Sequence, residues 1–432
     1  MNHRMFLRRV LLALLLVVPA LSVAQTGQGP IETSQTHIRL AGAAYRDGDF
    51  ARFVSELETA HALNPASLST RYNLACGYAL LGEREKSLAL LDELARQGAD
   101  FGMAADPDLG SLIGSEPFEA IVRRLAETTS PRITSETHVT FEQYGLIPEG
   151  ITRDPRSGRL FFGSMRTGEV YAVDTEGAIS RFSSVDRQNR LSVVGLTVDT
   201  DNDLLWATGS AFELAENHAA DDPATSGLFG IDLETGDVVR TLPVAHDGDW
   251  LNDVVVSDDG RLFATGSGLL VSDSDTGKLE RLPTSIEVFG SNGITFAGDG
   301  QTLLVASYPA GLYAVDANTG AARRLEPPEN VTLYGLDGLY WHGGALIAIQ
   351  NGVNPWRLIR IHLDAGLQRI TDVEILERGS PATTPMTGAI DGDVIYYVGE
   401  TEPPDDTPSQ FPEEMQQNRG AVTIRRAPLR ID

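Results

Sequence analysis

The chain has 432 residues, a formal net charge of −26 and a single cysteine. This length is sufficient for two or more domains with a substantial core. A charge of this sign opposes binding to nucleic acid and to anionic membrane surfaces, and one cysteine excludes an intrachain disulfide. We therefore expect a multidomain protein, without a nucleic-acid partner, that packing or a bound ion stabilises.

The amino terminus has the pattern of a targeting segment. Arg8 and Arg9 precede an apolar run over residues 10–18, and Ser22-Val23-Ala24 supplies the small residues of a cleavage site. This predicts a signal peptide over residues 1–24, too short to remain as a membrane anchor. No later stretch is long and apolar enough to span a bilayer. We expect an exported chain, periplasmic or secreted.

A polar linker is predicted over residues 25–35 and an all-α domain over residues 36–128. The turn glycines Gly48 and Gly82 lie 34 residues apart, which is the period of the tetratricopeptide (TPR) repeat. Cys76, in an apolar helical stretch, is expected to be a buried, unreactive thiol. Two interpretations of this TPR-like domain remain open. It is either a docking surface for a protein partner or a cap on the larger domain.

From residue 134 to 432 the periodicity becomes that of strands. Short apolar runs alternate with turn residues, and three outer turns are nearly identical, over residues 232–236, 273–277 and 316–320. The second of these resembles the start of a calcium loop, but its two siblings indicate a hairpin turn. Six units of about four strands predict an all-β six-bladed β-propeller, closed by pairing the carboxy-terminal strand near residues 421–429 with the strand near residues 138–141.

One position recurs just before an apolar strand in each unit, and we call its occupants the slot residues. Their separations are 45, 58, 40, 45 and 50 residues, close to the period of a propeller blade. The slot residues are Glu149, Val194, Asn252, Asn292, Asp337 and Thr387. In a closed ring the slots converge on one axis. Two carboxylates and two amides there would suit a hard cation, Ca²⁺ before Mg²⁺. The alternative is that dipeptides such as Asn292-Gly293 are ordinary turns.

Four segments carry a resemblance to a known family. The segments are Pro148-Glu149-Gly150, Leu251-Asn252-Asp253, Ser291-Asn292-Gly293-Ile294 and Leu336-Asp337-Gly338-Leu339. In this order and spacing they resemble the motifs of the senescence-marker-protein/gluconolactonase, or regucalcin-like, family over about residues 140–400. The resemblance implies a six-bladed propeller with one catalytic divalent ion, often calcium, that hydrolyses lactones or related esters.

Carried over by position, the resemblance implies a role for each donor. Glu149, Asn292 and Asp337 would ligate the ion, and Asn252 would contact the ion, a bound water or the substrate. The ion would act as a Lewis acid on the ester carbonyl, while Asp337 is the carboxylate expected to activate water. Asp337 and Asn252 are therefore the predicted catalytic residues.

The substrate pocket departs from the family pattern. Sugar lactonases of the family have an Arg two residues before the Asn, where this chain has Trp250. We expect Trp250, Asn252, Tyr308, Gln350 and Asn351 to contact the substrate, and a lactone or ester more hydrophobic than an aldonolactone. The alternative is a non-catalytic interaction protein, in which helical repeats dock a partner and the ion is structural.

Overall fold

The computed structural model describes residues 29–219, 225–379, 384–400 and 420–430. The predicted signal peptide, residues 1–24, lies outside these ranges. Among the described residues, no helix has both the length and the apolar character needed to cross a membrane.

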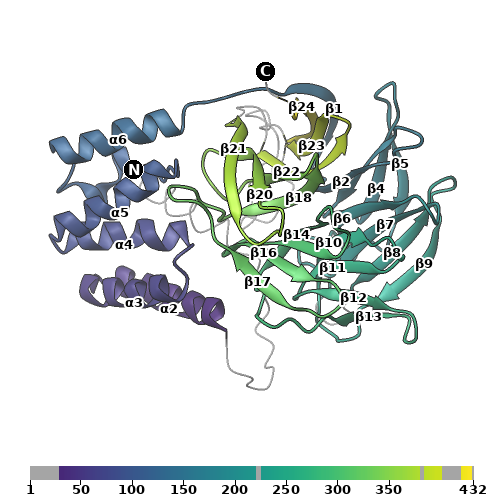
Figure 1. Cartoon of the computed structure of the whole chain (residues 1–432), viewed down its shortest axis with the longest axis horizontal. Helices are drawn as coiled ribbons and strands as arrows, with labels where there is room; N and C mark the ends of the chain where they lie inside the picture. The colour runs from purple at the N-terminus through teal and green to yellow at the C-terminus, as the bar shows by residue number, and fades with distance from the viewer. Residues whose placement is uncertain (1–28, 220–224, 380–383, 401–419, 431–432) are drawn as a thin grey trace.

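The amino-terminal part is a stack of antiparallel helices (Figure 1). The helices are α2 (Pro30–Arg46), α3 (Phe50–Leu63), α4 (Leu68–Leu80), α5 (Arg84–Arg96) and α6 (Glu116–Thr128), with 3₁₀ turns η2 (Met103–Ala105) and η3 (Pro107–Leu109). Gly48 and Gly82 end the first helix of each pair with positive φ, as the sequence predicted. The predicted linker 25–35 is too long, because α2 already begins at Pro30, where proline fits the first helical turn.

The rest of the described chain forms six sheets of four strands each. The strands are β1 (Glu136–Tyr144), β2 (Pro148–Arg153), β3 (Leu160–Ser164), β4 (Glu169–Val173), β5 (Ile179–Ser184), β6 (Ser192–Asp199), β7 (Leu204–Ser210), β8 (Gly227–Asp232), β9 (Val238–Pro243), β10 (Leu251–Val256), β11 (Leu262–Gly266), β12 (Leu270–Asp273), β13 (Lys278–Arg281), β14 (Ser291–Phe296), β15 (Thr302–Ser307), β16 (Gly311–Asp316), β17 (Ala322–Leu325), β18 (Leu336–His342), β19 (Ala345–Gln350), β20 (Arg357–Leu363), β21 (Ile370–Arg378), β22 (Thr384–Asp391), β23 (Val394–Glu400) and β24 (Ala421–Pro428).

These sheets are the blades of the predicted propeller. Five blades are consecutive meanders, and the sixth has the strand order β22-β23-β24-β1, so the first strand of the ring pairs with the last. This pairing joins the two ends of the ring and leaves neither as an open edge. The six-bladed fold is therefore confirmed, and apolar clusters between neighbouring blades form its core.

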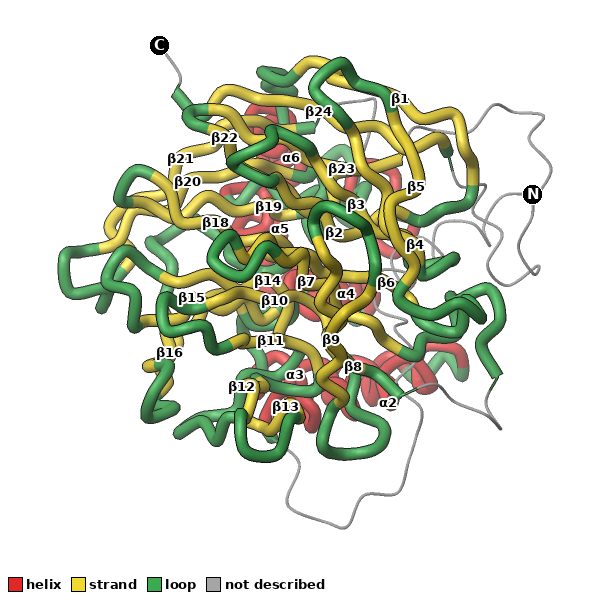
Figure 2. The backbone as a smooth tube through the Cα atoms, turned by 90° about the vertical axis from the view of Figure 1, so that its right-hand side faces the viewer, coloured by secondary structure: helices red, strands yellow, loops and turns green. Residues whose placement is uncertain are grey.

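The innermost strands β2, β6, β10, β14, β18 and β22 contact one another in turn around the axis (Figure 2). The start of each inner strand lies against the start of the next, as Gly150 does with Val194 and Gly293 with Asp337. All six inner strands therefore begin at the same end of the axis. We call this end the slot face and the opposite end the far face.

The helices lie against the slot face, behind the ring in the view of Figure 2. Asn64 donates its side-chain amide to the Pro309 carbonyl at 3.0 Å, and the Arg357 guanidinium donates to the Gln97 carbonyl at 2.7 Å. Tyr334 belongs to the apolar core of the helices. The two parts thus share a packed interface over blades four and five.

Candidate metal centre

Each inner strand contains a β-bulge at its slot. In the first blade Pro148 pairs with Ser164 and Ile151 with Phe162, so two inner residues oppose one on the partner strand. The same register shift occurs in each of the other inner strands. A bulge turns side chains out of the regular alternation. The slot residues are therefore re-aimed at the start of each strand, next to the axis.

The glycines after the slots are required by the neighbouring blade. Gly150 and Gly293 do not have the positive φ of a turn glycine. A β-carbon on Gly150 would overlap the Val194 carbonyl oxygen, and one on Gly293 would overlap that of Asp337. Close backbone approach explains the glycine, so the turn interpretation of these dipeptides is wrong.

The sixth slot prediction is wrong by one residue. Pro385 pairs with Gly399 and Gly388 with Tyr397, which places Met386 in the slot and Thr387 after it. The Thr387 hydroxyl accepts from the backbone N–H of Ile151 at 3.0 Å and donates to the Glu149 carbonyl. Thr387 therefore joins the last blade to the first rather than offering a ligand.

Two further threonines, which the sequence analysis did not identify, do the same between other blades. The Thr208 hydroxyl accepts from the Gly195 N–H at 2.7 Å and donates to the Asn252 carbonyl at 2.9 Å. Thr265 donates to the Asn292 carbonyl. These bonds satisfy backbone groups that the bulges release from the strand ladder, and they fix the backbone that carries Asn252 and Asn292.

Asp337 is the most completely enclosed of the predicted donors, with 4% of its surface exposed. The Asn351 amide donates to its Oδ2, and the Asn292 side chain also hydrogen bonds to the carboxylate. Asp337 Oδ1 and Asn292 Oδ1 are both buried and have no hydrogen-bond partner. Unpartnered buried oxygens are costly. Two of them on hydrogen-bonded neighbours are suited to a hard cation.

The electrostatics of Asp337 point the same way. Burial is the main cause that raises its pKa to about 7; the nearby Asp253 carboxylate adds to this rise, and the hydrogen bonds from Asn351 and Asn292 oppose it. Burial likewise raises the pKa of Asp253 to about 7. A divalent cation would offset this crowding of negative charge, because an opposite charge favours the ionised carboxylate.

The other two predicted donors also lie on the ring. Glu149 is half-buried, and its charge, with that of Asp337, contributes to the raised pKa of Tyr308, although burial of the phenol is the larger cause. Glu149 and Asp337 therefore face a common region beside Tyr308. Asn252 is half-buried one blade before Asn292. The structure thus places all four predicted donors at the starts of inner strands, with Asn292 and Asp337 in contact.

Three predicted substrate residues, Tyr308, Gln350 and Asn351, lie at or just after the ends of strands in the fourth and fifth blades. Tyr308 donates its hydroxyl to Asn351 Oδ1 at 3.2 Å, and Asn351 in turn supports Asp337. Gln350 is fully buried and donates to the carbonyls of Thr332 and Tyr334. A substrate contact from Gln350 is therefore wrong, because its amide is used to hold the loop before β18.

An apolar surface, which we call the apolar wall, lies on the slot face beside the first three blades, across the axis from Tyr308 and Asn351. Val194, in the second slot, forms a cluster with Ile147 and Met165. Phe212 packs against this cluster, and its ring centroid lies 5.6 Å from that of the half-buried Trp250. Trp250 is thus in place to extend an apolar surface toward the slots.

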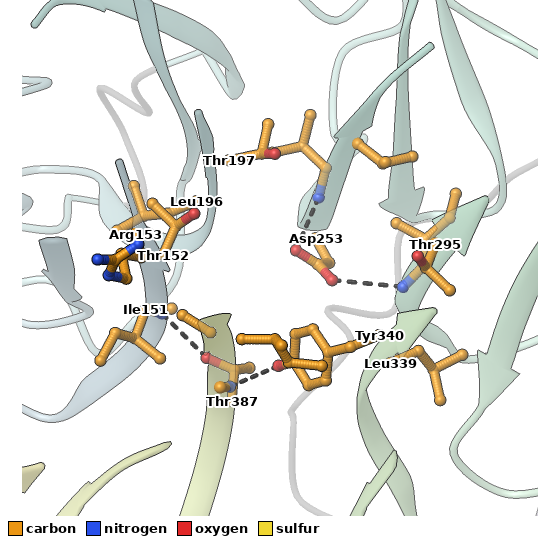
Figure 3. Close-up of a pocket in the computed structure, with 17 residues that line it drawn as sticks. Ile151, Thr152, Arg153, Leu196, Thr197, Asp253, Thr295, Leu339, Tyr340 and Thr387 are labelled. Atoms are coloured by element: carbon orange, nitrogen blue, oxygen red, sulfur yellow. Dashed lines mark hydrogen bonds between the residues drawn. The ribbon is translucent and has the colours of Figure 1, made fainter. Parts of the chain in front are cut away.

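A separate cavity of about 190 Å³ opens along the axis beyond the bulges (Figure 3). Its lining includes Asp253, Tyr340, Thr387 and Arg153. The Asp253 carboxylate accepts backbone N–H groups of the third and fourth blades, at 2.8 and 3.3 Å. Two successive residues of one bulge therefore face opposite ends of the propeller axis. Asn252 lies in the ring of slot residues, and Asp253 lines this far-face cavity.

Within the described part of the chain, three residues of metal-binding type also cluster among the helices. They are Cys76, Asp106 and Asp108. The hydroxyl of Tyr72 donates to Asp106, and that of Tyr45 donates to Asp108. Burial raises the pKa of the Cys76 thiol. Tyrosine donors thus occupy these carboxylates, and the thiol is part of a packed core.

One family model matches part of the propeller sequence. Residues 147–340 match the model of a family described as the SMP-30/gluconolactonase/LRE-like region. The matched segment contains all four predicted donors, which confirms the resemblance inferred from the motifs. A search of curated proteins found no significant match.

Solved structures with a similar fold include three proteins of low sequence identity. A calcium-binding regucalcin from Agrobacterium tumefaciens is 18% identical, with a TM-score of 0.45 over 68% of this chain and 97% of that one. A gluconolactonase from Xanthomonas campestris is 15% identical, with a TM-score of 0.44 over 67% and 89%. A virginiamycin B lyase from Staphylococcus aureus is 12% identical, with a TM-score of 0.43 over 66% and 97%.

Proposed function

We propose that the chain is a divalent-metal-dependent hydrolase of a lactone or related ester, with calcium as the preferred ion. One observation carries the proposal. Asp337 Oδ1 and Asn292 Oδ1 are buried, lack hydrogen-bond partners and lie in a ring of oxygen donors. The family model supports it, because the matched residues 147–340 include this ring.

The residues present fit such an ion. Glu149, Asn292 and Asp337 would hold it, and Asn252 would contact the ion, a water or the substrate. When bound, it would supply Lewis-acid polarisation of the ester carbonyl. The donor set contains only oxygens, as calcium requires.

Asp337 is suited to the proton transfer. Attack of water on the ester carbonyl releases one proton, and Asp337, kept ionised by the bound cation, would accept it as a general base. Asn351 donates to Oδ2 and so holds the carboxylate in one orientation. The hydrolysis then yields an alcohol and a carboxylic acid from the ester, or a hydroxy acid from a lactone.

The apolar wall indicates the substrate class. Trp250 and Phe212 present aromatic surface at the slot face where a sugar lactonase has an arginine. Aromatic and aliphatic side chains bind apolar groups, whereas they offer no partner for several sugar hydroxyls. We propose a lactone or ester with an apolar substituent. From residues 1–24 we also propose export to the periplasm or medium, where a free calcium ion is available to such a site.

The decisive experiment measures hydrolysis by the full mature chain on a panel of lactones and aryl esters, with calcium and with chelator. We expect calcium-dependent turnover, and a loss of at least about 100-fold in Asp337→Asn. Asp275→Asn, in an exposed outer turn, is the matched control and retains activity. Turnover that is unchanged in chelator would reject a metal-dependent mechanism.

The second candidate is a non-catalytic interaction protein with a structural ion. The observation that favours it is the helical part packed on the slot face, which restricts access from above blades four and five. It predicts calcium-dependent thermal stabilisation without turnover on any member of the panel. It also predicts a co-purifying partner that is lost when the exposed surface of α2 and α3 is altered.

A further inference from the structure

The interface between the helices and the slot face reaches the metal site. Tyr334, in the loop before β18, is 6% exposed and packs in the core of the helical part. Its hydroxyl hydrogen bonds with Ser69 of α4. A propeller residue thus completes the core of another part of the chain, and its position depends on that part being docked.

Tyr334 also contacts Tyr308, the first residue of a hydrogen-bonded chain that runs through Asn351 to Asp337. Its ring centroid lies 6.2 Å from that of Tyr308, with the rings tilted. The backbone ties the same two loops, because the N–H of Gly335 donates to the Tyr308 carbonyl at 2.8 Å. Helix docking therefore restricts where the Tyr308 ring can lie.

The Tyr308 hydroxyl then holds the Asn351 amide from the side opposite Asp337. It donates to Asn351 Oδ1 at 3.2 Å, which leaves Asn351 Nδ2 directed at Asp337 Oδ2 and at the Pro385 carbonyl. In the flipped orientation the amide oxygen would meet two acceptors, Asp337 Oδ2 and the Pro385 carbonyl oxygen. The flip is therefore strongly disfavoured.

With Oδ2 held by Asn351, Asp337 keeps its buried, unpartnered Oδ1 for an ion. Residues that orient a ligand from behind affect metal affinity substantially. Resting on the metal site of the proposed function, we infer that Tyr308 and Asn351 are positioning residues for Asp337, and that docking of the helices on the slot face sets the affinity of the site through Tyr334.

The test measures calcium affinity by titration calorimetry on the full mature chain, which needs no substrate. Tyr308→Phe removes the hydroxyl and keeps the ring, and we expect its affinity to fall about tenfold. Tyr171→Phe is the matched control, because its hydroxyl bonds Glu169 in the first blade. We expect that control to bind calcium as the wild type does.

A second pair of variants tests the link to the helices. Tyr334→Leu removes the ring contact and should weaken binding about threefold, whereas Tyr334→Phe keeps the ring and should change it little. In the double variant Tyr308→Phe/Tyr334→Leu the effects should not add, because both act through Asn351. Circular dichroism and thermal unfolding establish that each variant is folded.

The outcomes separate this inference from the proposed function. Wild-type affinity in folded Tyr308→Phe overturns the role of the hydroxyl. Wild-type affinity in Tyr334→Leu, with the helices more accessible to protease, overturns the link to docking. A wild-type chain that binds calcium but hydrolyses nothing removes the proposed reaction and leaves the inference to be decided by these affinities. A chain that binds no divalent ion overturns both.

Discussion

At Asp337, the structure places a carboxylate where water cannot solvate it and where Asp253 adds a second negative charge. Burial raises the pKa of both groups to about 7. Without a cation, the folded chain holds a proton on this pair that the unfolded chain would release at a lower pH. Protons and calcium therefore compete for the same carboxylate.

The first prediction concerns pH. A folded pKa near 7, raised from 3.8, favours the folded state at low pH, and this stabilisation is lost as pH rises from about 4 to 7. Calcium affinity should run the other way, falling about tenfold for each pH unit below 7 and levelling off above 8. Calorimetry between pH 5 and pH 8 measures it. Equal affinity at both ends would contradict the assignment of Asp337 as a ligand.

Residue identity selected the candidate donors but not all of their neighbours. Glu149, Asn252, Asn292 and Asp337 were selected because oxygen donors recurred at about the period of a propeller blade. Gln350 was misassigned because a sequence does not show which way the last residue of a strand points. Thr208 and Thr265 had an overlooked signal, the repeated tetrapeptide Ala-Thr-Gly-Ser at residues 207–210 and 264–267.

At the scale of the element, the bulge is the feature that makes the site. It turns each slot residue toward the axis and brings the following residue against the next blade. Gly293 lies so close to the Asp337 carbonyl that a β-carbon would overlap it. The inner strands can form a tight ring only because this position is small in most blades.

The second prediction follows from this contact. Gly293→Ala should lower the free energy of unfolding by about 3 kcal/mol, because backbone atoms have to move apart. Gly42→Ala in α2 is the control, since its new methyl would meet only the Arg46 side chain, at 3.6 Å, and it should stabilise by about 0.5–1 kcal/mol. Urea denaturation measures both. A Gly293→Ala chain as stable as the wild type would contradict the close approach.

The elements themselves were largely predictable. Gly48 and Gly82 marked the helix turns because only glycine takes positive φ readily, and alternating apolar runs marked the strands. Bulge register was not predictable, since a shift of one residue leaves the local pattern almost unchanged. That is why Thr387-Gly388 was mistaken for a slot and its glycine, when Met386 occupies the slot.

At the scale of the whole molecule, the helical part and the ring are joined through buried polar contacts as well as apolar packing. Arg357 of β20 is 6% exposed, and its guanidinium donates to the Gln97 and Gly98 carbonyls at the carboxyl end of α5. The positive charge meets the negative end of the helix dipole there. No sequence pattern indicated which face of the propeller the helices would cover.

The third prediction tests this anchor. Arg357→Met leaves the Gln97 and Gly98 carbonyls, just beyond the end of α5, without their donor, and hydrogen exchange in α5 should become at least about tenfold faster, since a lost buried hydrogen bond to a charged group costs about 1.5–3 kcal/mol. Arg369→Met is the control, because the Arg369 side chain is 81% exposed. Exchange in β15 and β19 should not change. Unaltered protection of α5 would show that apolar packing alone holds the interface.

The ring geometry is the central claim, because it makes donors that lie far apart in the chain into one site. Crystals soaked in calcium, or in manganese for its anomalous signal, test it directly. We expect one ion in the ring, about 2.3–2.6 Å from Asp337 Oδ1 and Asn292 Oδ1 for calcium. Density for an ion only in the far-face cavity beside Asp253, or no ion at millimolar concentrations, would contradict the account.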